Sequence, residues 1–149
     1  VIYLDETKYP IIRFNPAIKS MNYLGNMLAK KDTKSQGAFE PIFYNKNNII
    51  TECAIRNIFY IKNNIIHTPQ LSLGILGGVM RKTIINIAHT LNIEVQEREI
   101  NFNEVSSMDE AFMSSTGIGL LACYWDRWKS DYELTNNIKK ELFNRIKSH

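Results

Sequence analysis

Hydrophobic residues recur at intervals of three or four in three stretches of the chain, the spacing that predicts one face of an α-helix. Met21, Leu24 and Leu28 predict a first helix, which begins near Lys19 and ends near Gly37. Two later series predict a second helix behind a glycine pair and a closing amphipathic helix: Met80, Ile84, Ile87, Ala88 and Leu91, and Leu134, Ile138 and Leu142.

Short runs of β-branched and aromatic residues between these helices predict strands. Residues 42–44 and 49–51 flank an asparagine-containing stretch, and residues 58–61 and 65–67 flank another. Because asparagine favours turns, each pair of runs predicts a hairpin. Further strands are predicted at residues 1–4, 93–97 and 111–113. This mixture of strands and helices indicates an α/β fold of the mixed α+β kind.

Length, composition and charge narrow the classes of protein to consider. The chain has 149 residues, 44% of them hydrophobic, which suffices for one core but not for two full domains. No apolar run approaches the roughly 20 residues that span a bilayer, and no basic start leads into an apolar signal core, so we expect a cytoplasmic protein. The net charge of +3 comes from scattered lysines. Lys30, Lys31 and Lys34 cluster, but a solvated helix face explains them better than nucleic-acid binding.

The cysteines and histidines point to neither a disulfide framework nor a metal site. Cys53 and Cys123 are too few and too far apart in the sequence, so both are interpreted as reduced thiols. His67 and His89 lack a second ligand at metal-binding spacing. We therefore expect no metal.

Four separated segments carry side chains suited to an aldehyde cofactor with a phosphate group. Lys19 could form an imine if burial or a nearby cation lowered its pKa, although by position alone a solvated lysine is the simpler interpretation. Glu52 lies among apolar strand residues, where it needs a partner unless it faces water at a sheet edge. Gly78 precedes a helix whose free N–H groups favour a phosphate. Ser115 and Thr116 could contact a phosphate or simply form a turn.

In their order and wording, these segments resemble the class IV (fold type IV) pyridoxal-phosphate enzymes, which include branched-chain and D-amino-acid aminotransferases and 4-amino-4-deoxychorismate lyase. The resemblance runs from about Ile18 to Thr116. It implies the D-amino-acid aminotransferase-like fold, with residues 1–149 forming the C-terminal pseudo-barrel domain that binds pyridoxal 5'-phosphate. It also implies a smaller N-terminal domain outside the present chain, and a homodimer.

The resemblance gives each candidate residue a role. Lys19 would hold the cofactor as a Schiff base and then move a proton on the substrate. Glu52 would keep the pyridine nitrogen protonated. Tyr23 matches a tyrosine near the cofactor's phenolic oxygen, although core packing suits it nearly as well. The phosphate would be held by five residues: Gly78, Val79, Met80, Ser115 and Thr116. Met80 stands where the family has a threonine, so it offers only its backbone.

Two arginines and two tryptophans near these segments have more than one interpretation. Arg81 follows the phosphate segment, and we interpret it as a structural residue at the helix start and not as a phosphate ligand. Arg56 either contacts a substrate carboxylate or, as we favour, reaches solvent. Trp125 and Trp128 are expected to pack against other aromatic rings, with lining of a substrate pocket as the alternative.

Three hypotheses for the reaction remain open. The one we favour is a transaminase, in which Lys19 and the cofactor exchange an amino group between an amino acid and a 2-oxo acid. The second is 4-amino-4-deoxychorismate lyase, which eliminates pyruvate to form 4-aminobenzoate. Residues 52–53 and 79–81 look more like lyase sequences, whereas residues 18–22 look like D-amino-acid aminotransferases and some lyases. The third is a non-catalytic domain that folds around the cofactor or a partner; nucleic-acid and membrane partners are not expected.

Overall fold

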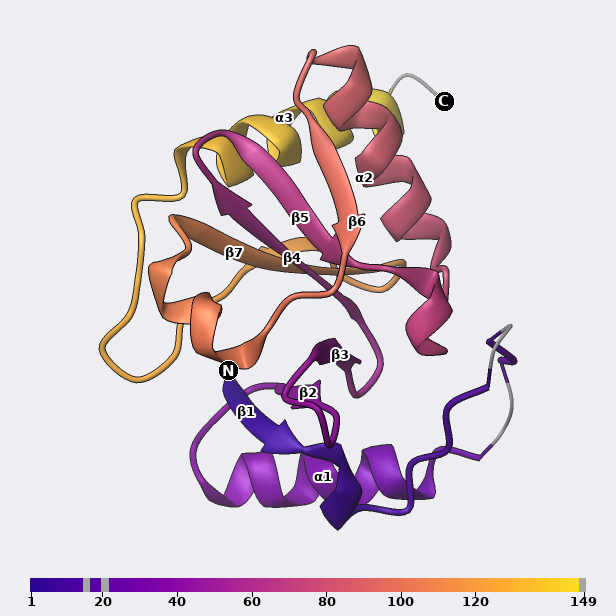
Figure 1. Ribbon diagram of the computed structural model, residues 1–149. Helices are drawn as coiled ribbons and strands as arrows, with labels where there is room; N and C mark the ends of the chain where they lie inside the picture. Colours follow the sequence, from indigo (N-terminus) through magenta and orange to yellow (C-terminus); the bar gives the residue numbers. More distant parts are fainter. Residues whose placement is uncertain (15–16, 20–21, 148–149) are drawn as a thin grey trace.

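The computed structural model describes residues 1–14, 17–19 and 22–147, and it places their strands in two sheets. The smaller sheet has the order β1-β2-β3, in which β1 is parallel to β2 and β2 is antiparallel to β3. Its strands are β1 (Ile2–Asp5), β2 (Pro41–Tyr44) and β3 (Ile50–Cys53). The helix α1 (Leu24–Ser35) lies along this sheet, at the bottom of Figure 1.

The larger sheet has the order β6-β5-β4-β7-β8. Its strands are β4 (Asn57–Lys62), β5 (Ile65–Pro69), β6 (Val95–Arg98), β7 (Glu110–Ser115) and β8 (Gly119–Ala122). Strands β5 and β6 run parallel, and the other neighbours run antiparallel. Two helices, α2 (Val79–Thr90) and α3 (Glu133–Lys147), cover one face of this sheet (Figure 1). Helix α2 provides the crossover that a parallel pair needs.

Short 3-10 helices lie between the strands and the longer helices. In the described part of the chain there are three of them: η1 (Glu6–Lys8), η2 (Leu71–Leu73) and η3 (Phe102–Ser107). Within the described ranges, no helix combines the length and the apolar character needed to cross a membrane.

The central strand β4 is buried on both faces, which ties the two sheets together. Phe59 packs with Ile84 of α2 on the helix-covered face. The neighbouring positions Ile58 and Tyr60 point the other way, where they pack with Ile42 of the smaller sheet. Because successive side chains of a strand point to opposite faces, one strand supplies both cores. The site described below lies where the connection between β3 and β4 links these two layers.

Most of the predicted elements are confirmed. The two predicted hairpins are β2 with β3 and β4 with β5, and their turns hold Asn48, Asn63 and Asn64 in the left-handed region that asparagine tolerates. The predicted second and third helices are α2 and α3, and the strands expected at residues 1–4, 93–97 and 111–113 are β1, β6 and β7. Strand β8 was not predicted. The mixed α/β fold class is therefore confirmed.

The first helix differs from its prediction in both its start and its face. It begins at Leu24, so Lys19 lies in the segment before it, and Met21 falls outside the described residues. Leu24 and Leu28 are 62% and 43% exposed, whereas the buried positions are Gly25, Ala29 and Thr33. The helix packs through small residues because it runs very close to other backbone: a Cβ added at Gly25 would lie 2.7 Å from the Pro10 carbonyl carbon.

Candidate functional site

A cavity of about 440 Å³ opens beside the connection between β3 and β4, the start of α2 and the end of β7. A volume of a few hundred Å³ is typical of pockets for small ligands. Its wall is formed by described residues from four stretches of the chain, within residues 11–26, 52–57, 74–80 and 114–116. All eight site residues predicted from the sequence are among them: Lys19, Tyr23, Glu52, Gly78, Val79, Met80, Ser115 and Thr116. The fold therefore gathers segments that are up to 97 residues apart in the sequence, from Lys19 to Thr116.

Lys19 and Tyr23 approach the cavity from the segment that leads into α1. Lys19 is exposed and lies in a stretch without regular secondary structure, while the half-buried Tyr23 is the residue that caps the helix. Both line the cavity. The prediction that Lys19 stands at a helix start is wrong, because the helix begins five positions later, at Leu24. Its position on the cavity wall is the one that a Schiff base between Lys19 and a cofactor in the cavity would need.

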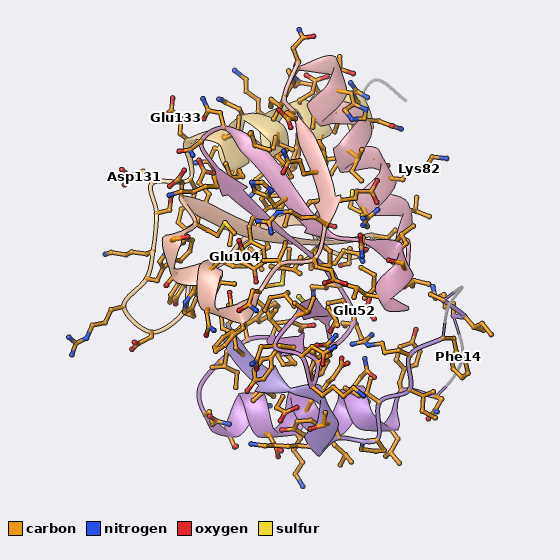
Figure 2. All side chains as sticks on the ribbon, in the orientation of Figure 1. Phe14, Glu52, Lys82, Glu104, Asp131 and Glu133 are labelled. Carbon is orange, nitrogen blue, oxygen red and sulfur yellow. The ribbon has the colours of Figure 1, made fainter. Side chains whose placement is uncertain are left out.

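Glu52 reaches the cavity from β3 and is largely buried. Its Oε1 accepts a hydrogen bond from Nη1 of Arg13, and its Oε2 accepts one of 3.3 Å from the backbone N–H of Leu76. Burial raises the pKa of the Glu52 carboxyl, and the charge of Arg13 opposes that rise. The alternative of a water-facing acid at a sheet edge is therefore wrong. Figure 2 shows Glu52 in the middle of the molecule, on the same side as Phe14.

Arg13 is a residue of the cavity wall that the sequence analysis missed. Besides Glu52, it binds Glu6, which accepts from Arg13 Nε at 3.1 Å and from Nη2 at 2.8 Å. Arg13 and Glu52 are 39 residues apart in the sequence. Arginine is a common residue type, and no local motif marks this one. Only the tertiary contact reveals it.

The start of α2 forms a second wall of the cavity. Gly78 is the residue before the helix and makes no side-chain capping bond, and the first helical hydrogen bond runs from Lys82 N–H to the Gly78 carbonyl at 3.1 Å. The N–H groups of Val79 and Met80 therefore lack acceptors within the helix, and they lie at its positive end. Such an end is suited to an anion.

The end of β7 supplies hydroxyl groups to the same cavity. Ser115 closes the strand, and the exposed Thr116 follows it in the turn. Behind them lies Ser114, which pairs with Asn57 across the sheet and also lines the cavity. Its Oγ is buried, and it has no hydrogen-bond partner among the residues that the structure describes. A buried hydroxyl without a partner is costly, so a ligand here would find an available polar group.

The backbone at Gly78 leaves no room for a side chain. A Cβ there would lie 2.5 Å from Asn57 Oδ1, and Asn57 is held in place by a hydrogen bond of 2.7 Å from its Nδ2 to the Leu76 carbonyl. We expect Gly78→Ala to lower the free energy of unfolding by about 1–3 kcal/mol, because the amide must move and that bond must break. Thermal unfolding measures this change.

A matched control for that substitution is one residue away. A Cβ at Gly77 would meet only the Leu71 side chain, at 3.5 Å, an ordinary contact. Gly77→Ala should therefore unfold within a few degrees of the parent protein, since it introduces no clash. Equal losses in both variants would show that the tight approach of Gly78 to Asn57 is not what limits this position.

Both arginines considered in the sequence are held by protein partners. Arg81 is buried and donates to the Pro69 carbonyl at 3.0 Å and to Glu97 at 2.7 Å, which confirms its interpretation as a structural residue. Arg56 lines the cavity, but it binds Glu40 at 2.5 Å. The favoured prediction that Arg56 reaches solvent is wrong, because its side chain is only 9% exposed.

The remaining sequence candidates do not line the cavity. Trp125 and Trp128 stack with their ring centroids 3.9 Å apart, as expected for aromatic packing, and neither lines the cavity. Cys53 and Cys123 are buried free thiols, and burial raises the pKa of Cys123 to about 12. His67 accepts a hydrogen bond of 3.0 Å from Arg98 Nε. In the described part of the chain, no group of three or more histidine, cysteine or acidic side chains is placed to hold a metal ion.

Comparison with known proteins gives a consistent result. Residues 1–123 match the family described as "Amino-transferase class IV". D-alanine aminotransferase of Listeria monocytogenes is 38% identical over 101 residues, which cover 68% of this chain and 35% of that protein. Aminodeoxychorismate lyase of Bacillus subtilis is 33% identical over 104 residues, which cover 70% of this chain and 36% of that protein.

Solved structures show the same fold. The branched-chain amino acid aminotransferase of Thermobaculum terrenum, solved in its PLP form, superimposes with a TM-score of 0.84. The match covers 97% of this chain and 50% of that protein, at 24% sequence identity, so it establishes the fold. The chain spans about a third of the length of the two curated relatives named above.

Proposed function

We propose that this chain, which belongs to the class IV aminotransferase family, binds pyridoxal 5'-phosphate through Lys19 and serves the transfer of an amino group between an amino acid and a 2-oxo acid. The observation that carries the proposal is the cavity itself. A lysine, a carboxylate, a helix start and a hydroxyl pair, predicted from four separate segments, all line it. Family membership adds that the relatives are enzymes.

The residues present fit the cofactor. The cavity volume of about 440 Å³ is in the range of small-ligand pockets. The uncapped start of α2 and the hydroxyl of Thr116 suit a phosphate, and the carboxylate of Glu52 suits a protonated ring nitrogen. When bound, pyridoxal phosphate supplies an electron-withdrawing ring that stabilises negative charge at the substrate's α-carbon. The protein would hold and orient the cofactor and keep its ring nitrogen protonated.

Lys19 is proposed as the residue that bonds the cofactor covalently. Within the described ranges it is the one lysine on the cavity wall. With its amine free beside the substrate, Lys19 would carry a proton to or from the α-carbon. Tyr23, on the same segment, is proposed to contact the cofactor next to Lys19.

The phosphate is proposed to lie between the start of α2 and the turn after β7. If backbone amides at Val79 and Met80 act together with the Thr116 hydroxyl, Thr116→Val should weaken cofactor binding by about 1.5–3 kcal/mol, the scale of a hydrogen bond to a charged group. Met80→Thr adds a hydroxyl at the same place and should strengthen binding or leave it unchanged. Dissociation constants for pyridoxal 5'-phosphate measure both effects.

Folding must be checked in both variants before affinities are compared. Thr116 is exposed, so its replacement by the equally branched valine should leave the unfolding temperature unchanged. Unaltered affinity in a folded Thr116→Val protein would place the phosphate elsewhere and reduce Ser115 and Thr116 to turn residues.

The reaction could also be that of a lyase. The similarity to aminodeoxychorismate lyase is nearly as strong as that to D-alanine aminotransferase. The same lysine and carboxylate would serve either reaction. Incubation of the protein with D-amino acids, with branched-chain amino acids and with 4-amino-4-deoxychorismate separates the two. Formation of a 2-oxo acid with a 2-oxo acid acceptor indicates a transaminase, and release of pyruvate with 4-aminobenzoate indicates the lyase.

Further features of the protein follow as proposals from its family. We infer that residues 1–149 form the large, cofactor-binding domain, that the protein acts as a homodimer, and that it works in the cytoplasm on small-molecule substrates. Exposed apolar side chains near the cavity support an assembly: Ile12, Ile18, Leu24, Met27 and Leu28. Analytical ultracentrifugation tests the dimer.

A non-catalytic domain is the alternative to an enzyme. Absence of a cofactor absorption band after addition of pyridoxal 5'-phosphate would favour this alternative.

A further inference from the structure

The carboxylate of Glu52 is the cavity end of a chain of three charged groups. Arg13 donates from Nη1 to Glu52, and from Nε and Nη2 to a single oxygen of Glu6, at 3.1 and 2.8 Å. Thr51 links Arg13 to Glu6: its Oγ1 accepts a hydrogen bond of 3.1 Å from Arg13 Nη2 and donates one of 3.0 Å to Glu6 Oε2. One guanidinium is therefore shared between two carboxylates. We call Glu6, Arg13 and Glu52 the shared-arginine cluster.

The shared-arginine cluster is shielded from water and carries an uncompensated charge. The side chains of Glu6, Arg13 and Glu52 are 11%, 17% and 14% exposed, so solvent screens their mutual interactions only weakly. Two carboxylates and one guanidinium leave a net charge of −1. A proton or a cation bound at the Glu52 carboxylate, the end of the cluster that faces the cavity, would neutralise this negative charge. This carboxylate belongs to a residue of the cavity wall, and its Oε2 accepts a hydrogen bond of 3.3 Å from the backbone N–H of Leu76.

Other charged groups near the cavity do not supply this neutralising charge. Lys19 and Arg56 are the further charged residues of its described wall. Arg56 is bound to Glu40, which also accepts from Lys30 at 3.0 Å, so its charge is directed away from Glu52. Lys19 is the residue proposed to bond the cofactor, and a covalently bonded lysine is not free to pair with Glu52.

We propose that Glu6 is a positioning residue that acts through Arg13: it engages two nitrogens of the guanidinium and so leaves Glu52 with enough negative charge to hold a protonated ring nitrogen in the cavity. The proposal rests on the proposed function, because the ring is that of pyridoxal 5'-phosphate. Glu6 lies behind Arg13 and is not part of the cavity wall. Its effect on a bound ring is therefore indirect, through the guanidinium that it shares with Glu52 and through its own negative charge.

The electrostatic signs make the proposal testable in the protein without cofactor. The negative charge of Glu6 raises the pKa of Glu52, and the positive charge of Arg13 lowers it, on top of the rise caused by burial. Replacing Glu6 by glutamine removes the first effect and frees Arg13 to pair with Glu52 alone. Replacing Arg13 by methionine removes the second effect. The two variants should therefore move the pKa of Glu52 in opposite directions.

The first experiment follows the Glu52 carboxyl by ¹³C NMR in protein labelled at the glutamate side-chain carbon, with Glu52→Gln identifying the signal. Glu6→Gln should lower the titration midpoint, and Arg13→Met should raise it. Glu141→Gln is the matched control, because it breaks another Glu–Arg pair, to Arg145 at 3.2 Å, and should leave the midpoint unchanged. The proposal is overturned if the Glu52 midpoint is unchanged in Glu6→Gln. It is also overturned if the midpoint moves in the same direction in Glu6→Gln and Arg13→Met, which is the result expected if both substitutions merely loosened the fold.

The second experiment adds pyridoxal 5'-phosphate labelled with ¹⁵N in the ring. Glu6→Gln should raise its dissociation constant about threefold to tenfold and move the ring-nitrogen signal toward the unprotonated position, whereas Glu141→Gln should change neither. If Glu52 titrates as expected but neither Glu6→Gln nor Glu52→Gln moves the ring signal, the role assigned to Glu52 in the proposed function fails, and the proposal fails with it. If Glu6→Gln changes neither the ring-nitrogen signal nor the titration midpoint of Glu52 relative to the parent protein, only the role of Glu6 is overturned.

Discussion

Lys19→Ala should abolish both the visible absorption of the bound cofactor and the catalytic activity of the protein. The reason is that Lys19 is the one lysine on the described wall of the cavity, and it lies in the segment that resembles the family's catalytic-lysine motif. If Lys19 has the role proposed for it, the variant has no amine to bond the cofactor and no base to move the α-proton. Absorption in the near-ultraviolet to blue and a transamination assay measure the two losses.

A second lysine provides the control for this substitution. Lys82 is exposed on α2 and points away from the centre of the molecule in Figure 2. Lys82→Ala removes the same amine and should keep the absorption band and the activity. Borohydride reduction followed by peptide mass spectrometry identifies the bonded lysine in the parent protein. A reduced cofactor found on any lysine other than Lys19 would overturn the whole assignment of the site.

Glu52→Gln should lower kcat by about 100-fold or more, the scale observed when one preorganised electrostatic group is removed from an active site, and should weaken cofactor binding far less. In the proposed function the carboxylate would keep the ring nitrogen protonated, and protonation matters most when negative charge develops at the substrate's α-carbon. Binding is expected to depend chiefly on the phosphate contacts at α2 and Thr116. Steady-state kinetics and cofactor titration separate the two effects.

The amide that replaces Glu52 also leaves Arg13 beside Glu6 alone, so folding has to be compared. Glu133→Gln makes the same chemical change at an exposed position far from Glu52 (Figure 2) and should leave kcat unchanged. If turnover of a folded Glu52→Gln protein stays within about twofold of the parent, a barrier change below about 0.5 kcal/mol, the role of Glu52 is wrong.

The local elements of this fold were predictable because their signals are local. Asparagines between β-branched runs define two hairpins, and the apolar series from Ile84 and from Leu134 define α2 and α3. The helix α1 was predicted on the wrong face, because its large apolar residues are exposed and its small ones are buried. Hydrophobic periodicity assumes that bulky side chains face the core, and that assumption fails where a helix approaches another backbone through glycine and alanine.

The sequence by itself determined the family of this protein and eight of the residues that line its cavity, because those eight occur in short motifs whose order is specific. Only the tertiary structure decided what surrounds them. Arg13 reaches Glu52 across 39 residues and is shared with Glu6, and Arg56 turns out to be held by Glu40. Such pairings join side chains from different elements, so their energies depend on distance and burial in the folded chain. No spacing along a sequence encodes either quantity.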